Sequence, residues 1–249
     1  MTETPTASTP RTRFAVPGRI VASNRAAATW QRARLTDIRR ETPAASTFRF
    51  AVPGWQGHLP GQHLMMRLTA EDGYTAQRHY SLASAPDDSG HIELTLDHVE
   101  GGEVSGYLHT LARAGDEVEV RGPLSGFFAW PGDRPALLLG GGSGVVPLIS
   151  MLRHHRRHRL DVPLRLLVSA RTREELLYAD EYGDETTAVF TREGEGRRLS
   201  ADHVAPLLAA GAPEWEAYVC GSNAFAEHAS RLLVDLGQPV DRIRIERYG

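Results

Sequence analysis

Cysteine is nearly absent from this sequence, and lysine is missing altogether. The single cysteine, Cys220, excludes a disulfide within the chain and also an iron–sulfur cluster or another four-cysteine metal site. Any redox chemistry would therefore need a bound organic cofactor. Since the 28 basic residues are all arginines, phosphate groups would have to be bound by arginine or by backbone amides.

Long apolar runs are missing as well. No stretch approaches the roughly 18 to 20 apolar residues of a membrane-spanning helix, and residues 1–10 contain no hydrophobic signal region. We therefore expect a cytoplasmic protein without a membrane span. The formal net charge of −3 argues against a nucleic-acid partner, because neutralising phosphates needs an excess of basic residues.

The spacing of hydrophobic residues divides the chain into parts. Residues 1–28 show little periodicity and are expected to be a flexible segment. Residues 29–131 contain short β-like runs separated by Gly and Pro, which predicts an antiparallel β-barrel domain with one helix at 104–112. In residues 132–249 strands alternate with helices, which predicts an α/β domain with a parallel sheet. The expected strands cover residues 31–38, 47–51, 63–69, 79–83, 91–98, 117–121, 136–139, 164–169, 187–190, 216–220 and 242–246, and the later helices cover 145–158, 174–182, 199–209 and 224–236.

The first informative motif is the run Arg78, His79, Tyr80 and Ser81 on an expected barrel strand. An arginine can bind a pyrophosphate through two parallel hydrogen bonds. Alternate residues of a strand face the same way, so the motif could present an aromatic ring and a hydroxyl to a flat heterocycle. The alternative is an ordinary half-buried strand with a surface arginine.

The second motif covers residues 101–105 and opens the expected barrel helix. Gly101 and Gly102 precede free amides at a helix N-terminus, which is an anion site, and Ser105 adds a hydroxyl. The alternative is a hairpin turn followed by a capped helix. Together with the arginine motif, this segment could bind the two ends of one diphosphate.

The third motif is the glycine-rich stretch 140–147, between an apolar strand and a helix. Backbone amides in such a turn can approach the pyrophosphate of a dinucleotide. Pro147 replaces the third glycine of the usual fingerprint, and proline suits the first helical turn, where its missing donor is not needed. We interpret the stretch as a variant dinucleotide-binding motif.

These motifs, in this order and approximate spacing, resemble the ferredoxin–NADP reductase superfamily. The resemblance runs from about Trp30 to the C-terminus. It implies an FAD-dependent, NAD(P)H-dependent oxidoreductase with a flavin barrel and a nucleotide domain, and without a fused iron–sulfur domain. The segments that carry it are Pro60-Gly61-Gln62, Arg78-His79-Tyr80-Ser81, residues 101–105, Gly122-Pro123, residues 141–147 and Cys220-Gly221.

The resemblance implies roles for the barrel motifs. Arg78 would bind the FAD pyrophosphate, Tyr80 would lie against the isoalloxazine ring, and Ser81 would hydrogen-bond the flavin nitrogen that accepts hydride. A second anchor for the diphosphate favours FAD over FMN. The other cofactor-binding residues on this side would be His79, Gly102, Val104 and Ser105.

In the second domain the resemblance implies a site for the nicotinamide dinucleotide. Cys220 would lie near the nicotinamide carbon that gives up hydride, although most free cysteines are simply buried small hydrophobes. Glu246 would relay a proton or orient Ser81, and Tyr248 would cover the flavin until nicotinamide displaces it. An ordinary terminal strand with an exposed tyrosine is the alternative. The remaining residues of this site would be Gly141, Gly142, Ser143, Gly144, Pro147 and Gly221.

Two arginines after consecutive strands bear on the choice of nucleotide. In dinucleotide folds an acid after the second strand binds the ribose diol, whereas an arginine there accommodates a 2′-phosphate. Arg171 follows the second strand, and Thr191 and Arg192 follow the third. Each arginine could instead be an ordinary surface residue. We predict NADPH, with NADH as the alternative.

The run of arginine and histidine at 153–159 is expected to be a solvated helix face. His154 and His158 share one face, but the sequence nearby offers no further ligand, so we expect no metal site. A minor alternative is the docking of an acidic redox partner on these arginines.

Electrons would have to leave the chain, since it has no cluster cysteines. The expected acceptor is a separate protein such as a ferredoxin, an oxygenase component or another metalloprotein. The alternatives are a diaphorase or flavin reductase that acts on small acceptors, and a flavoprotein electron-transfer subunit of a larger complex. We expect the chain to be a monomer.

Overall fold

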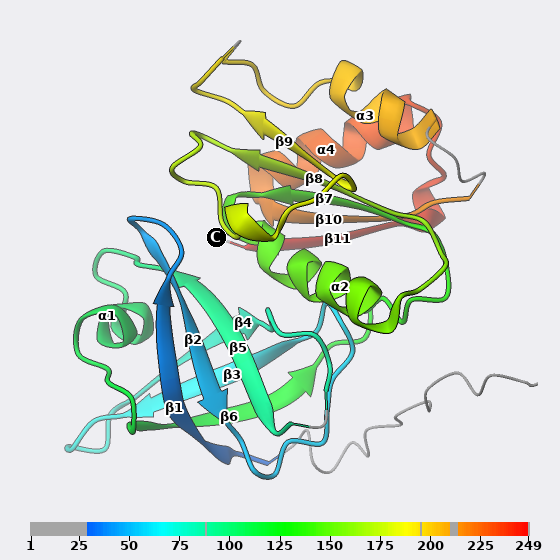
Figure 1. The fold of residues 1–249 in the computed structure, drawn as a ribbon. Helices are drawn as coiled ribbons and strands as arrows, with labels where there is room; N and C mark the ends of the chain where they lie inside the picture. Colours follow the sequence, from blue (N-terminus) through cyan, green and yellow to red (C-terminus); the bar gives the residue numbers. More distant parts are fainter. Residues whose placement is uncertain (1–28, 88, 195, 210–213, 249) are drawn as a thin grey trace, which may run out of the picture.

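The computed structural model describes residues 29–87, 89–194, 196–209 and 214–248. They form an antiparallel sheet followed along the chain by a parallel sheet (Figure 1). The expected flexible segment 1–28 lies outside the described residues. The predicted fold class, a barrel followed by an α/β sheet, is confirmed.

The antiparallel sheet has six strands in the order β4-β3-β6-β1-β2-β5. Leu82, just after β4, bridges to Leu94 of β5, so the two outer strands meet and the sheet closes into a barrel. Alternation along β3 points Leu64 and Met66 into the barrel core and leaves His63 on the opposite face. The elements are β1 (Gln31–Arg40), β2 (Ala45–Ala51), β3 (His63–Thr69), β4 (Thr75–Ser81), β5 (His91–Asp97), α1 (Glu103–Thr110) and β6 (Glu117–Leu124).

The parallel sheet has five strands in the order β11-β10-β7-β8-β9. The chain continues from β7 to β8 and β9 on one side and places β10 and β11 on the other. The carboxyl ends of β7 and β10 therefore mark the switch point at which such sheets bind ligands. The elements are β7 (Ala136–Gly141), α2 (Val145–His158), β8 (Leu164–Ala170), β9 (Thr186–Phe190), α3 (Ala201–Ala209), β10 (Glu216–Ser222), α4 (Asn223–Asp235) and β11 (Ile243–Tyr248).

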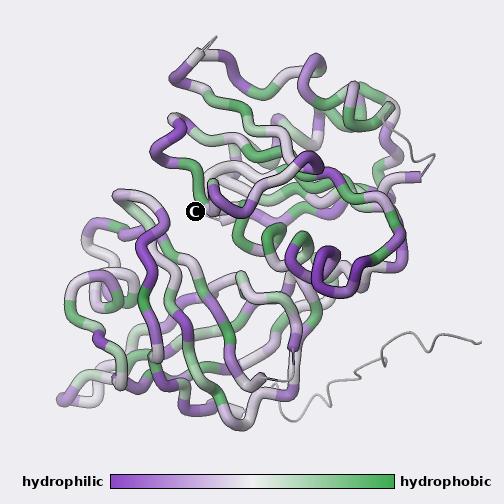
Figure 2. Tube along the Cα trace, in the orientation of Figure 1, coloured by the Kyte–Doolittle hydropathy of each residue, from purple (hydrophilic) through white to green (hydrophobic). Residues whose placement is uncertain are grey.

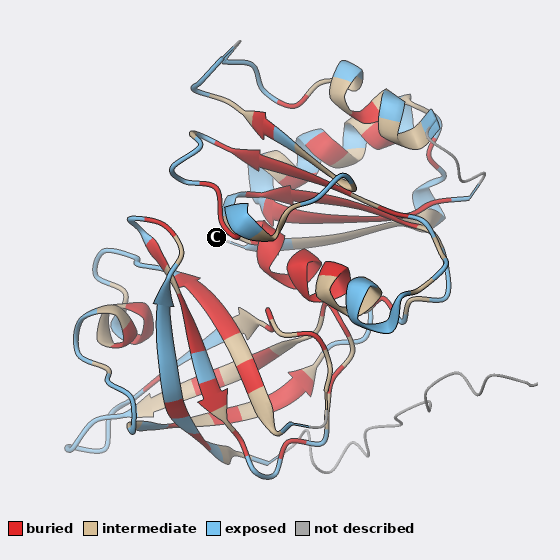
Figure 3. Cartoon of the chain, in the orientation of Figure 1, coloured by how far each residue is buried: buried red, intermediate tan, exposed pale blue. Residues whose placement is uncertain are grey.

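Helices lie on both faces of the parallel sheet, with α2 on the face toward the barrel and α3 and α4 on the other (Figure 1). This explains why the sequence of β7 is apolar throughout: all six of its residues are buried (Figure 3). Figure 2 shows that α2 is hydrophobic in its first half and hydrophilic toward its end. The glycine-rich turn between β7 and α2 therefore lies at the buried end of the helix, close to the barrel.

Arg153 on α2 ties the parallel sheet to the barrel. It donates to the Ala83 carbonyl at 2.9 Å and pairs with Glu93 at 3.0 Å, both on the barrel side. It also pairs with Glu181 at 2.5 Å. The expectation of a solvated face at 153–159 is wrong for Arg153, whose side chain is only 17% exposed. The expectation is right for residues 156–159, the last four of this run, which are exposed.

The predicted helix at 174–182 is wrong. Within this range the chain forms only a short 3-10 turn, Ala179–Glu181. Tyr178 has a positive φ of 58°, and its hydroxyl donates to Thr95 of β5 at 2.6 Å. A contact with a strand far away in the sequence has thus overridden the local helical pattern.

The other predicted elements are found close to their expected positions. The strand predicted at 79–83 begins and ends earlier, at Thr75–Ser81, while His63–Thr69 and Val145–His158 have the predicted bounds. The predicted domain boundary at residues 131 and 132 stays a prediction. No helix in the described part of the chain is long and apolar enough to cross a membrane.

Candidate functional site

A cavity of about 700 Å³ lies between the barrel and the carboxyl edge of the parallel sheet. Its wall contains members of the arginine motif, of the segment 101–105 and of the glycine-rich stretch, although these lie far apart along the chain. From the barrel come Arg78, His79, Tyr80, Ser81, Gly102, Val104 and Ser105, and from the second sheet come Ser143, Pro147, Cys220, Glu246 and Tyr248.

The barrel side of the cavity has two groups that attract anions. Arg78 lies next to the start of α1, where its Nη2 is 3.6 Å from Oε2 of Glu103. Gly102 is the N-cap of this helix and has no side chain to accept the first amides, which leaves them for a ligand. Both groups fit the diphosphate of a dinucleotide flavin.

Tyr80 provides an aromatic surface beside these groups. It is half-buried and packs against the barrel core. Burial raises the pKa of the Tyr80 hydroxyl to about 12, so it stays protonated at neutral pH. A neutral ring in the wall fits a flat heterocycle.

Close packing explains the glycines of the turn between β7 and α2. A Cβ at Gly144 would overlap the carbonyl group of Cys220 and the Cα of Gly221, so only glycine lets the turn lie directly on β10. Gly142 has a φ of +56°, which glycine adopts without strain. Pro147 lies in the first turn of α2, as predicted. This side of the cavity is therefore shaped mainly by the backbone.

Tyr248 at the end of β11 reaches across to this turn. Its hydroxyl donates to the Gly141 carbonyl at 2.8 Å. Burial raises the pKa of Tyr248, so the hydroxyl remains a donor at neutral pH. The last described residue of β11 thus lies against the turn that the sequence assigned to the nicotinamide nucleotide.

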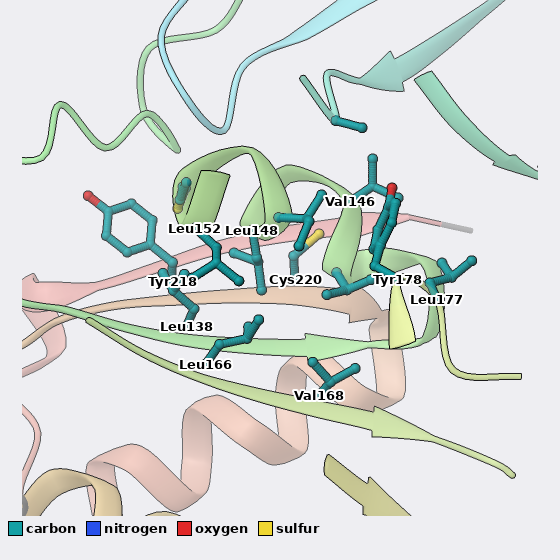
Figure 4. Packing of buried hydrophobic residues seen from close by; sticks show 14 of the residues in the cluster. Leu138, Val146, Leu148, Leu152, Leu166, Val168, Leu177, Tyr178, Tyr218 and Cys220 are labelled. Carbon is teal, nitrogen blue, oxygen red and sulfur yellow. The ribbon is translucent and has the colours of Figure 1, made fainter. Parts of the chain in front are cut away.

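Cys220 lies near the end of the buried part of β10 and is 3% exposed. Figure 4 shows it beside Val146 and Leu148 of α2. Burial, with a smaller contribution from the charge of Glu246, raises the pKa of the thiol. A neutral buried thiol is a poor nucleophile, so this position favours a packing role at the cavity wall.

His63 is a cavity residue that the sequence reasoning missed. It begins β3 and pairs in register with Ser81 of β4. Its Nδ1 lies 3.4 Å from Oε1 of Glu246, and its ring centroid lies 5.2 Å from that of His79. The available signal was the position directly after Pro60-Gly61-Gln62, at the start of a strand that lies beside the arginine motif.

Arg171, Thr191 and Arg192 are not part of the cavity wall. They follow β8 and β9 at the same edge of the sheet, and the Arg192 amide donates to the Arg171 carbonyl at 2.9 Å. Arg171 also lies 3.8 Å from Glu175. The structure therefore brings the two arginines together, at a distance from the flavin side of the cavity.

Comparison with known proteins places this geometry in a family. A family model described as the FAD-binding domain of oxidoreductases matches residues 32–129. The chain is 32% identical over 237 residues to ferredoxin–NADP reductase B of Sorangium cellulosum. The matched region covers 87% of this chain and 96% of that protein. The chain belongs to the ferredoxin–NADP reductase superfamily. As a member of this superfamily it is an FAD-dependent oxidoreductase that uses NAD(P)H, which confirms the predicted enzyme class, the predicted FAD and the use of a nicotinamide nucleotide.

Two further proteins are similar to this chain, one in fold and one in sequence. A ferredoxin NADP+ reductase from Neisseria gonorrhoeae, solved with bound FAD and NADP, has a TM-score of 0.76 and 20% identity, covering 88% of this chain and 99% of that one. At this identity the likeness concerns the fold. A flavohemoprotein of Deinococcus radiodurans is 30% identical to this chain over 218 residues. The match covers 80% of this chain, and the chain spans about half (53%) of that relative's length.

Proposed function

We propose that this reductase transfers hydride from NADPH to bound FAD and then passes single electrons to a separate redox protein, such as a ferredoxin or an oxygenase component. The observation that carries the proposal is the cavity between the two sheets, whose wall joins the arginine motif, the start of α1 and the glycine-rich turn. Hydride transfer requires donor and acceptor rings in contact, and one shared cavity meets that requirement.

The barrel residues would bind and orient the flavin. Arg78 and the free amides at the start of α1 would hold the diphosphate, Tyr80 would lie against the ring system, and the Ser81 hydroxyl would bond the ring nitrogen. Bound FAD supplies the chemistry of accepting two electrons together and releasing them one at a time. The packed wall around Cys220 would keep water from the face that nicotinamide approaches.

Arg171 and Arg192 support NADPH over NADH. Both are exposed, and the hydrogen bond between their backbones places them in one small region beyond β8 and β9. An arginine at the end of the second strand can accommodate a 2′-phosphate, for which NADH has no counterpart. Glu175 beside Arg171 is the residue that could instead favour the ribose diol of NADH.

A separate protein as electron acceptor is supported by two observations. The chain contains one cysteine, so it cannot bind an iron–sulfur cluster on four cysteines of its own. The relative from Sorangium cellulosum, which the chain matches over nearly its whole length, is named for both ferredoxin and NADP. Both features fit a reductase that gives its electrons to a mobile carrier.

Anaerobic reduction of the FAD-loaded protein tests the nucleotide part of the proposal. We expect NADPH to bleach the flavin absorbance rapidly, and NADH to do so with a kcat/KM about tenfold lower, because NADH lacks the 2′-phosphate and a hydrogen bond to such a charged group contributes about that factor. Flavin that neither nucleotide bleaches would contradict the reductase function and would leave a cofactor-binding subunit of a larger complex.

Acceptor kinetics test the second half of the proposal, the transfer of electrons to a separate protein. We expect cytochrome reduction to depend on an added ferredoxin or oxygenase component. Equal rates with free flavin or dyes, and no gain from any protein carrier, would instead support a diaphorase or flavin reductase.

A further inference from the structure

His63 lies where the barrel, the parallel sheet and the cavity meet. Its Nδ1 is 3.4 Å from Oε1 of Glu246 on β11, and its ring is tilted by 66° to that of His79, with centroids 5.2 Å apart. Ser81 lies directly opposite His63 across the β3–β4 pair. All four residues line the cavity, so three polar groups surround His63 within one site.

Two polar atoms of this group have unused hydrogen-bonding capacity. In the described part of the chain, neither Nδ1 of His63 nor Oε2 of Glu246 makes a hydrogen bond, although both atoms are buried. Buried polar atoms are normally paired, and exceptions call for an explanation such as a catalytic role. The 3.4 Å separation from Oε1 is an ion-pair distance, which a small movement or the arrival of a proton on the ring would turn into a hydrogen bond.

The chemistry of the reductase requires a proton to leave this region. Hydride from a nicotinamide carries one proton and two electrons, whereas an acceptor that takes single electrons takes no proton. The balance is NAD(P)H giving NAD(P)⁺, one proton and two electrons. One proton is therefore left for each hydride that is transferred, and it must pass from the cavity, whose wall includes Ser81, to solvent.

We propose that His63 is the side chain that carries this proton from the Ser81 and Glu246 side of the cavity to solvent. Glu246 balances the positive charge on the ring while the proton is there, and His79 is the exposed residue through which the proton leaves. This inference rests on the release of single electrons in the proposed function, and it does not depend on which protein receives them.

The groups around His63 fit this role. His79 of β4 has a lowered pKa, because burial and the nearby positive charges of His63 and Arg121 of β6 disfavour a second proton there, so it passes a proton on readily. Cys220 of β10 has a raised pKa from burial and does not compete as a base. Histidine is a common proton shuttle in enzymes, because its two ring nitrogens can accept a proton on one side and release one on the other.

The test measures proton release directly. FAD-loaded protein is reduced photochemically, without nucleotide, and is mixed with ferricyanide in weakly buffered solution with a pH-indicator dye. One trace follows flavin reoxidation and the other follows the proton. In the wild-type protein we expect release to keep pace with reoxidation. In His63→Ala we expect proton release to be about 10- to 100-fold slower. Added imidazole should restore most of the rate, once the dye response is calibrated for the buffering that imidazole adds.

His91→Ala is the matched control, since His91 lies on β5 outside the cavity wall and hydrogen-bonds the Ser89 carbonyl. It should behave as wild type. Unchanged proton release in His63→Ala would overturn the proposal, and so would a slower release that imidazole does not restore, which is the result expected of a packing role.

Glu246→Gln provides an independent measurement that keeps the shape of the side chain. We expect slower proton release in this variant and no recovery with imidazole, because the imidazole of His63 is still present. Release as fast as in wild type would overturn the proposal, whatever His63→Ala does. Since reduction uses light and oxidation uses ferricyanide, a failure of NADPH or ferredoxin to react would contradict only the proposed function.

Discussion

The two sides of the cavity are built by different means. On the barrel side, a half-exposed arginine and the uncapped start of α1 offer charge and hydrogen bonds to a diphosphate. On the side of the parallel sheet, the wall is a glycine-rich turn packed on β10, with buried apolar residues behind it. Ligand binding on the barrel side should therefore depend on side-chain chemistry. On the side of the parallel sheet it should depend on the path of the backbone.

The largest effect is expected from Gly144→Ala on the backbone side. The new Cβ would overlap the Cys220 carbonyl and displace the turn, and a misplacement of about 1 Å near the reacting groups can cost about 100-fold in rate. We expect kcat/KM for NADPH to fall by about that factor while FAD stays bound. Gly126→Ala is the control, because a Cβ there meets nothing within 4 Å. Equal activity of the two variants would contradict the view that the parallel-sheet side of the cavity depends on the path of the backbone.

Arg78→Ala tests the charged side. Hydrogen bonds to charged groups contribute about 1.5–3 kcal/mol, so the Kd for FAD should rise by about 10- to 100-fold. Fluorescence titration of the apoprotein measures this change. Arg49→Ala, at an exposed position on β2, should leave the Kd as in wild type. Tight FAD binding by Arg78→Ala would show that α1 alone holds the diphosphate.

Replacing both Arg171 and Arg192 with alanine should weaken discrimination between nucleotides. We expect kcat/KM to fall about tenfold for NADPH and to stay within about twofold for NADH, with a smaller difference at high salt because exposed charges are screened. Arg231→Ala on α4, paired with Glu227, is the control. An equal loss with both nucleotides would remove these arginines from the 2′-phosphate site.

Tyr248→Phe should have the smallest effect. It removes the hydrogen bond to the Gly141 carbonyl, which contributes about 0.5–1.5 kcal/mol, so the ring is released more easily and the KM for NADPH should fall about threefold. Because burial raises the pKa of Tyr248, the hydroxyl stays protonated above the ordinary tyrosine value of about 10. A plot of the wild-type KM against pH should accordingly show no step attributable to Tyr248 up to pH 10. A step below pH 10 that is present in wild type and absent in Tyr248→Phe would contradict a protonated Tyr248 hydroxyl.

Local patterns predicted most of the fold. Strand His63–Thr69 alternates and helix Val145–His158 has a clear apolar first half, so each could be placed from neighbouring residues alone. The range 174–182 failed because Tyr178 is held by Thr95 of the barrel, a partner that periodicity cannot reveal. Arg153 was misjudged for the same reason, since its partners belong to other elements.

Residue content and local motifs were enough to assign the class of this protein: one cysteine excluded a cluster of its own, and short motifs in order indicated a flavin barrel followed by a nucleotide domain. These features are local, because a turn, a helix start or a missing residue type can be recognised without knowing what lies nearby. That His63 meets Glu246 and that Tyr248 binds the glycine-rich turn follows only from the three-dimensional arrangement. Both contacts join residues more than 100 positions apart: the packing of the barrel on the parallel sheet brings the first pair together, and the strand order of the parallel sheet brings the second.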